Sequence, residues 1–289
     1  MKALIPWYAR IAAMIALAWL PVPYSFWKRM GVYSLGEMHQ PDYVFRVFKF
    51  HLAGSGLSGR SGLVGLEMGP GDSAASAVIA KAAGFSAFHL VDSGDYANRD
   101  VEIYKEVSRT CLREGLAPPD IERIDRFDDI LPACNATYST HGLKSYREIP
   151  TESVDFIFSQ AVMEHVRRHE FVQVAQEMRR ILKPDGVASH QVDLQDHLGG
   201  ALNNMRISSR WWESEWMARS SFYTNRIRFA EMCGIFERAG FLVDVVSTVR
   251  WDTAPISIEK LVPEFRHHSQ EDLRVSSFHV LLRPRPQAG

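Results

Sequence analysis

The stretch from Gly62 to Ser76, GLVGLEMGPGDSAAS, decides the fold. An apolar run ends at Glu67, and the turn Gly69-Pro70-Gly71 then leads into a helix expected over residues 73–83. Glycine serves positions where the backbone takes a positive φ or comes close to a ligand. In an open α/β sheet, such a turn lies at the carboxyl end of the first strand, where ligands bind. The stretch therefore predicts the first strand, turn and helix of an α/β domain with a ligand site at the turn.

Apolar strand-like runs and helical runs alternate along the rest of the chain. After the first strand at residues 62–68, we expect strands at residues 86–92, 133–139, 153–159, 187–194, 241–250 and 276–283, and helices at residues 98–114, 168–182 and 226–239. Alternation of this kind predicts a mostly parallel sheet with helices on both faces. The seven expected strands form one domain over residues 61–289, in which the tryptophan-rich residues 198–224 form a substrate-side insertion or lid.

Residues 1–60 differ from this domain and are expected to form a helical, aromatic-rich extension that ends in the connector Gly54–Gly62, GSGLSGRSG. The apolar run Ile11–Leu20 is about half as long as a membrane span requires. Three interpretations stay open for it: a helix packed on the domain's own core, a helix lying in a membrane interface, and a signal peptide. We expect a cytoplasmic protein and leave peripheral contact of residues 1–30 with the inner membrane surface open.

The composition limits the other function classes. The chain has 289 residues, a formal net charge of −1 and 46 % hydrophobic residues, which is ordinary for a folded domain without a concentrated basic face. We therefore expect no nucleic-acid partner. The three cysteines, Cys111, Cys134 and Cys233, show no CxxC spacing, so we expect neither a disulfide framework nor a zinc site.

A second acidic residue, Asp92, narrows the range of ligands that the site could bind. Asp92 ends the second expected strand, where its carboxylate can accept hydrogen bonds from both ribose hydroxyls of a nucleoside ligand. Gly69, Gly71 and Ala74 also satisfy the dinucleotide pattern GxGxxA, so NAD fits as well. Glu67 favours S-adenosylmethionine, because a buried carboxylate needs a cationic partner and a dinucleotide brings an anionic pyrophosphate instead.

Four stretches together carry a family resemblance. LEMGPGDS resembles motif I of the class I S-adenosylmethionine-dependent methyltransferases, and LVDSGDY resembles their second motif. SVDFIFSQAVMEHV resembles their fourth-strand motif, with the EHV sequence of some bacterial methyltransferase-domain proteins, and ILKPDGVASHQVDL resembles the motif that follows. The tail, GFLVDVVSTVRWD with SSFHVLLRP, looks like the family's final antiparallel strand pair. The resemblance covers residues 62–194 most closely. It implies the Rossmann-like class I methyltransferase fold, with an antiparallel final strand, and S-adenosyl-L-methionine as cofactor.

The chain departs from the family pattern at two places. Ser73 stands where motif I has its third glycine, and the adenine-edge motif after the third strand has no clear counterpart at residues 141–144. The residues that the resemblance and the strand ends assign to the cofactor are Glu67, Gly69, Pro70, Gly71, Ser73, Asp92, Ser93, Ser159 and Gln160.

The acceptor side is predicted from residue chemistry. Methylation of an alcohol needs a general base, and histidine suits that role near neutral pH. His197, close to Asp193 and Asp196, and His165 in the MEHV sequence are the catalytic candidates, whereas His190 is expected in the core. Without a third carboxylate element near Asp193 and Asp196, we expect no metal.

Arginine and aromatic residues are concentrated in and just after residues 198–224. Arg210, Trp211, Asn225 and Arg226 are the candidate substrate-binding residues, because such side chains stack on rings and bind hydroxyls or phosphates. The alternative is that the tryptophans pack against the sheet edge. The expected function is O-methylation of a sugar, a lipid-linked molecule or another small acceptor. An NAD-dependent oxidoreductase and a non-catalytic methyltransferase-like binding module remain alternatives.

Overall fold

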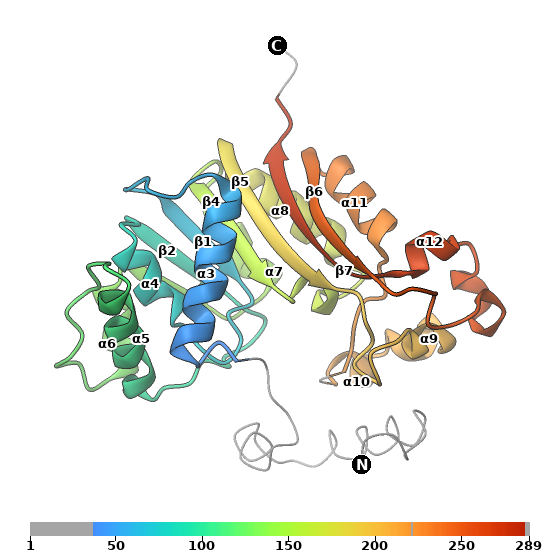
Figure 1. Cartoon of the computed structure of the whole chain (residues 1–289), viewed down its shortest axis with the longest axis horizontal. Coiled ribbons are helices and arrows are strands. Elements are labelled where there is room, and N and C mark those ends of the chain that lie inside the picture. The colour runs from blue at the N-terminus through green and yellow to red at the C-terminus, as the bar shows by residue number, and fades with distance from the viewer. Residues whose placement is uncertain (1–36, 221, 287–289) are drawn as a thin grey trace.

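A seven-stranded sheet with the order β3-β2-β1-β4-β5-β7-β6 forms the centre of the molecule (Figure 1). The computed structural model describes residues 37–220 and 222–286. The strands are β1 (Val64–Met68), β2 (Ala87–Val91), β3 (Ala136–Ser139), β4 (Val154–Gln160), β5 (Leu182–Asp193), β6 (Phe241–Arg250) and β7 (Val275–Pro284). Strands β1 to β5 run parallel, and β7 runs antiparallel to both of its neighbours. The predicted fold class is thereby confirmed.

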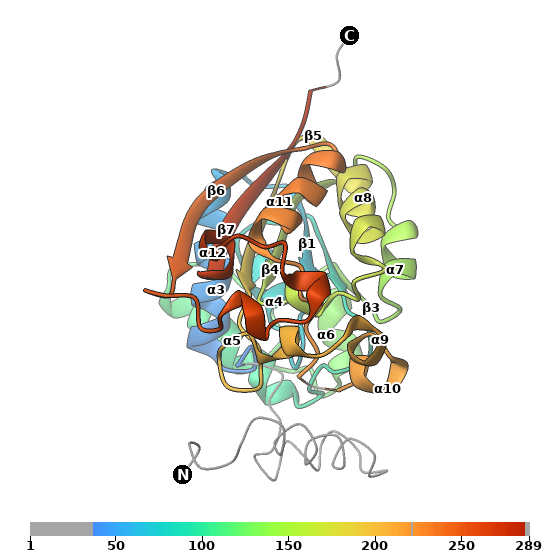
Figure 2. The same ribbon diagram turned by 90° about the vertical axis from the view of Figure 1, so that its right-hand side faces the viewer.

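Helices cover both faces of the sheet. One face carries α3 (Pro41–Ser55), α4 (Ser76–Ala82) and α5 (Val101–Arg113), and the other carries α7 (Leu143–Arg147), α8 (Phe171–Ile181) and α11 (Phe229–Arg238), as Figures 1 and 2 show. The remaining helices are α6 (Phe127–Ala133), α9 (Ser209–Trp212), α10 (Glu215–Ala218) and α12 (Gln270–Leu273), with 3-10 turns η1 (Met163–His165), η2 (Asn203–Arg206), η3 (Ile258–Lys260) and η4 (Pro263–Phe265).

Side-chain alternation along the strands assigns each residue to one face. In β1, Leu66 and Met68 join the core beneath α8 and α11, so Gly65 and Glu67 face the side of α3. Gly65 must lack a side chain there, because an added Cβ would lie 2.6 Å from the Phe88 ring.

Helix α3 belongs to the core of the domain, although it lies within the predicted extension. Its Phe48 is buried, and the ring centroids of Phe85, Phe88, Phe156 and Phe158 lie 5.7–6.4 Å away. The connector after α3 therefore joins two parts of one packed unit. The apolar run at residues 11–20 and the membrane contact considered for residues 1–30 lie outside the described residues. Within the described part, no helix is both long and apolar enough to span a membrane.

Element boundaries differ from the prediction by three residues at the starts of α4, α5, α8 and α11, and two strand starts differ for a structural reason. Residues 133–135 do not start the third strand, because helix α6 occupies Phe127–Ala133. Strand β5 begins at Leu182, five residues before the expected start at 187, and Lys183 reaches across to Asp155 of β4 with its Nζ 2.8 Å from the carboxylate. The pairing with β4 is irregular here, since Val154 pairs with Leu182 and Phe156 with Val187, and the sequence predicted a turn at Pro184–Gly186.

Candidate active site

Glu67 and Asp92 flank the glycine turn on one face of the sheet. Glu67 lies on the face of α3, and Asp92 follows Val91, which packs on the opposite core. Gly69 (φ 68°) and Gly71 (φ 64°) take left-handed backbone conformations, as the motif predicts. The turn is closed, since the Gly69 amide donates to the Val91 carbonyl at 2.8 Å.

Asp92 already accepts hydrogen bonds from neighbouring backbone amides, and the Ser93 hydroxyl lies 3.4 Å from its Oδ1. Its carboxylate accepts from the amides of Gly71 at 3.0 Å and Ser93 at 2.7 Å, through different oxygens. Each carboxylate oxygen can accept a second hydrogen bond. Burial raises the pKa of Asp92, and these amides act in the opposite direction. The residue therefore fits the expected contact with two neighbouring hydroxyl groups of a ribose.

Glu67 is almost completely enclosed, with 1 % of its surface exposed. It accepts a hydrogen bond from the Ser76 hydroxyl at the start of α4. Burial raises the pKa of Glu67 to about 8, the Ser76 bond lowers it, and the Asp92 charge raises it further. A cation placed beside Glu67 would favour its ionised form, whereas an anion would oppose it.

The residues after the glycine turn are fastened to the protein. Pro70 and Ser73 are buried, and the Ser73 hydroxyl accepts from the Ala75 amide at 3.2 Å. Asp72 lies 2.6 Å from Nδ1 of His39, just before α3. The segment before the first strand thus holds the turn in place, a contact that no motif in the sequence indicates.

At the end of β4, Ser159 and Gln160 lie on opposite faces of the sheet, although the sequence analysis assigned both to the cofactor site. Glu67 pairs in register with Phe158, so Gln160 shares its face and Ser159 does not. The Ser159 hydroxyl lies 2.8 Å from Nδ1 of the buried His190, on the other face. The predicted cofactor role of the Ser159 side chain is therefore wrong, because period-two alternation turns it away from the site.

An open cavity of about 280 Å³ adjoins Gln160. Its lining comes from one side of α3 and from the ends of β4 and β5, and consists of Tyr43, Arg46, Val47, Phe50, Gln160 and Gln191. Gln160 and Gln191 are paired across the two strands. Sequence reasoning identified only Gln160, because the four residues from α3 belong to no motif and Gln191 was not singled out within the motif at residues 181–194.

The two catalytic candidates are brought together. The rings of His165 and His197 lie edge to face with centroids 4.9 Å apart. Nδ1 of His165 lies 2.8 Å from the Tyr223 carbonyl oxygen and must donate to it, because a carbonyl only accepts. Desolvation by surrounding protein and the His197 ring lower the pKa of His165 to about 4, although part of the residue stays exposed. His165 is therefore neutral near pH 7, with Nε2 available to accept a proton.

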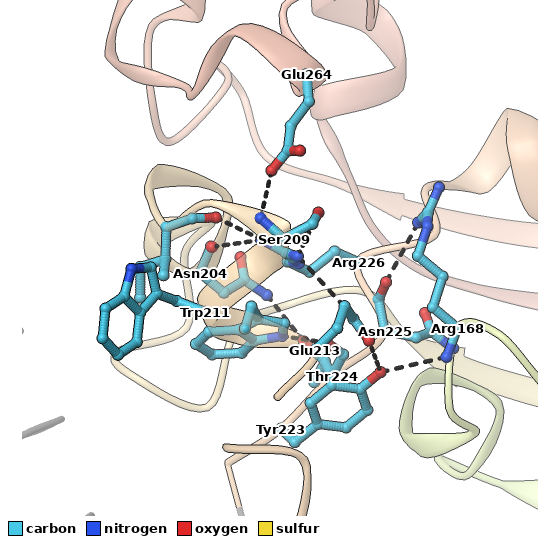
Figure 3. A network of polar contacts seen from close by, with 12 residues as sticks. Arg168, Asn204, Ser209, Trp211, Glu213, Tyr223, Thr224, Asn225, Arg226 and Glu264 are labelled. Carbon is cyan, nitrogen blue, oxygen red and sulfur yellow. Dashed lines mark hydrogen bonds and ion pairs between the residues drawn. The ribbon is translucent and has the colours of Figure 1, made fainter. Parts of the chain in front are cut away.

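Asn225 and Arg226 support the insertion and do not face solvent (Figure 3). Asn225 is 1 % exposed, and its Nδ2 donates to the carbonyls of Met163 and Val166 at 2.8 and 2.9 Å. Arg226 donates to the Ile207 carbonyl at 2.6 Å and forms an ion pair with Glu213. Internal partners hold both side chains, which also line a small cavity together with Glu164 and Asp193, and their predicted contact with substrate stays a prediction.

The two neighbouring tryptophans of α9 differ in burial, so the two interpretations of the insertion, substrate binding and packing, apply to different residues. Trp212 is fully buried and its Nε1 donates to the Thr224 carbonyl at 2.7 Å. Trp211 is 61 % exposed, with the Trp216 ring 6.3 Å away, and Arg210 beside it is also exposed. Packing therefore accounts for Trp212, while Arg210 and Trp211 remain accessible to an acceptor.

The acidic residues after β5 shape a loop. Asp196 accepts from the amides of Leu198, Ala201 and Asn203, and Asp193 accepts from the Gln195 amide. Among the described residues, no group of three or more His, Cys, Asp or Glu side chains is arranged to hold a metal ion. The hydrogen bonds to loop amides therefore explain the presence of these two carboxylates without a metal ion.

Comparison with known proteins adds a family and a set of similar folds. Residues 123–189 match the family described as "Methyltransferase domain". No curated protein matches the chain. Among solved structures, phosphoethanolamine N-methyltransferase 2 of Haemonchus contortus is 15 % identical, with coverage of 92 % of this chain and 61 % of that one and a TM-score of 0.48. An S-adenosylmethionine-dependent methyltransferase of Methanosarcina mazei is 13 % identical, with coverage of 80 % and 96 % and a TM-score of 0.48. Identities this low transfer no substrate to this chain. Residues 123–189 are therefore similar to a methyltransferase domain, and the strand order agrees with the fold that the sequence predicts.

Proposed function

We propose that this chain methylates an oxygen atom of a small acceptor, with S-adenosylmethionine as methyl donor. The observation that carries the proposal is the position of Glu67 and Asp92 on one face of the sheet, on either side of the glycine turn. The residues proposed to hold the donor are Glu67, Gly69, Pro70, Gly71, Ser73, Asp92, Ser93 and Gln160.

Charge supports this donor over a dinucleotide. A buried carboxyl whose pKa is raised to about 8 gains most from a ligand that brings positive charge. S-adenosylmethionine carries an ammonium and a sulfonium, whereas the pyrophosphate of NAD would meet Glu67 with like charge. Asp92 serves the ribose in either case, so Glu67 is the residue that discriminates.

His165 is the proposed general base, with His197 as its neighbour. The Tyr223 carbonyl holds the Nδ1–H tautomer, which leaves the Nε2 lone pair to accept the hydroxyl proton of the acceptor. S-adenosylmethionine supplies an activated methyl group, which bonds to the acceptor oxygen as its bond to sulfur breaks. The chain itself has to position the hydroxyl and remove its proton.

The acceptor is proposed to be a sugar, a lipid-linked molecule or another small molecule. The exposed indole of Trp211 offers a stacking surface, and the Arg210 guanidinium beside it can bind hydroxyls or phosphates. We propose no nucleic-acid partner, since the net charge of −1 reflects no excess of basic residues.

Calorimetric titration with S-adenosylhomocysteine and, separately, with NAD tests the donor. We expect binding of S-adenosylhomocysteine alone, and binding of NAD alone would overturn the proposal. Incubation with methyl-labelled S-adenosylmethionine and small-molecule extracts tests the transfer. Label should enter a product that strong base does not cleave as an ester and that the His165→Asn variant makes far more slowly. Donor binding without transfer to any extract would instead favour a binding module.

A further inference from the structure

The cavity beside α3 has one apolar side. Tyr43, Val47 and Phe50 are spaced by three or four residues and so lie along one side of the helix, which crosses the sheet in front of β4 and β5 (Figure 1). Phe50 is 48 % exposed, although a large aromatic side chain gains from burial. The wall therefore offers contact area to an apolar or aromatic ligand.

On the opposite side of the cavity, a chain of hydrogen bonds holds the Gln160 side chain. Oε1 of Gln160 lies 3.1 Å from Nε2 of His51, and an amide oxygen only accepts, so His51 donates. Burial lowers the pKa of His51 to about 4, which keeps the ring neutral and makes its Nδ1 an acceptor. The Ser189 hydroxyl donates to that Nδ1 at 2.7 Å and accepts from Nε2 of His279 at 2.9 Å.

In this arrangement the Gln160 amide turns its oxygen towards His51. With Oε1 bound to His51, the Nε2 group is left to donate into the cavity. Arg46, an exposed residue of α3, adds a guanidinium to the lining. Among the described residues, neither an aspartate nor a glutamate lines the cavity, and Glu37 acts electrostatically on Tyr43 from outside the lining. The polar side of the cavity thus presents the Gln160 amide nitrogen, the Gln191 amide and the positive charge of Arg46.

We propose that this cavity binds the acceptor molecule as an amphiphile, with an apolar or aromatic body against Tyr43, Val47 and Phe50 and one anionic group on Arg46, next to the Gln160 amide that the acceptor shares with the donor. A carboxylate or phosphate matches this arrangement of donors. The identification of the ligand as acceptor rests on the proposed function, because the cavity lies at the ends of β4 and β5, on the same face as Glu67. The preference for an anion rests on the cavity alone.

Titration of the full chain with octanoate, 1-octanol and octylammonium tests the preference, since the three probes differ in their head groups. We expect octanoate to bind at least about tenfold more tightly than the other two. Arg46→Gln should reduce octanoate binding to the level of octanol, and Arg46→Lys should retain most of it. Phe50→Ser, at an exposed position, should weaken octanoate and octanol alike.

S-adenosylhomocysteine binding, measured on the same proteins, separates the possible failures. We expect its affinity to be unchanged in the Arg46 variants, which also shows that they fold. Equal binding of the three probes overturns the proposal. So does a loss of S-adenosylhomocysteine affinity in Arg46→Gln with octanoate unaffected, because Arg46 would then serve the donor's carboxylate. Octanoate binding in a protein that fails to bind S-adenosylhomocysteine would reject the proposed methyl transfer and keep the anion site.

Discussion

The imidazole of His165 packs edge to face against that of His197, with ring centroids 4.9 Å apart, and donates from Nδ1 to the Tyr223 carbonyl. His165 lies in the turn after β4 and His197 in the loop after β5. Asn225 braces the first of these segments through the carbonyls of Met163 and Val166. The insertion therefore fixes both the position and the tautomer of the proposed base.

His165→Asn tests this base. The asparagine amide nitrogen can still donate to the Tyr223 carbonyl, but no basic nitrogen remains. We expect methyl transfer to fall by about 10²-fold or more, with S-adenosylhomocysteine affinity and the melting temperature little changed. Because the pKa of His165 is lowered to about 4, the group stays deprotonated at neutral pH, and its contribution to the rate should be lost only as the pH falls towards 4.

The matched control is His197→Asn, which removes the neighbouring ring and keeps His165. We expect a smaller loss of rate and an upward shift of the acidic limb, since the His197 ring contributes to lowering the pKa of His165. Full activity of His165→Asn would mean that the ring only supports the turn.

Gly69→Ala should damage the glycine turn more than its backbone angle alone predicts. A Cβ at Gly69 would lie 2.5 Å from Cγ1 of Val162, whereas a Cβ at Gly115, which also has a positive φ of 80°, meets nothing within 4 Å. Gly115→Ala should therefore cost about 1 kcal/mol of stability through backbone strain, and Gly69→Ala about 1–3 kcal/mol more through overpacking.

Chemical denaturation of the two glycine variants measures their losses of stability, and S-adenosylhomocysteine titration measures the damage to the glycine turn. Val162→Ala, combined with Gly69→Ala, should recover part of the lost stability by making room for the new methyl group. If the two single glycine variants lose the same stability, contact with Val162 does not matter.

The end of β4 shows which features the sequence predicts and which depend on the pairing of distant strands. The motif order predicted the sheet, the glycine turn and the acidic pair, because these depend on local periodicity and on residues next to each other in the chain. Ser159 and Gln160 were assigned together by proximity to a strand end. Counting alternation from Glu67 would have separated them, but only with the β1–β4 register, which pairs residues about ninety positions apart.

The missed residues depend on long-range packing. Tyr43, Arg46 and Phe50 reach the site only because α3 folds back across β4 and β5, and no local pattern in the sequence specifies that placement. Asn225 and Arg226 were predicted to bind substrate because such side chains bind hydroxyls or phosphates. Carbonyl groups from distant segments satisfy them in the interior, and sequence composition does not reveal such partners.

Glu67→Gln should stabilise the folded protein and weaken donor binding. The pKa of this carboxyl is raised to about 8 when folded and is near 4.5 when unfolded, so the folded state holds its proton more tightly. Stability from this group is fully present below about pH 4.5 and falls as the pH rises towards 8. The melting temperature of the variant should therefore exceed that of the wild type increasingly over this pH range.

Donor binding should change in the opposite direction. A cationic ligand favours the ionised carboxylate, so S-adenosylmethionine should bind the glutamine variant noticeably more weakly, and NAD should be affected little. Calorimetry in buffers of different ionisation enthalpy should detect proton release from the wild type near pH 7 and none from the variant. Equal donor affinities in the two proteins would leave Glu67 as a purely structural residue.

The last prediction separates the two adjacent tryptophans of α9. Trp212→Ala removes a fully buried ring and its hydrogen bond to the Thr224 carbonyl, so it should cost about 3–5 kcal/mol and loosen the insertion. Trp211→Ala removes a ring that is 61 % exposed, so stability should change by no more than about 0.5 kcal/mol.

If Trp211 stacks on the acceptor, this variant should raise the KM for acceptor at unchanged S-adenosylhomocysteine affinity, and Trp211→Phe should restore most of the loss. Unchanged acceptor kinetics in Trp211→Ala would show that the exposed indole takes no part in recognition, and the acceptor would then have to be held by other residues.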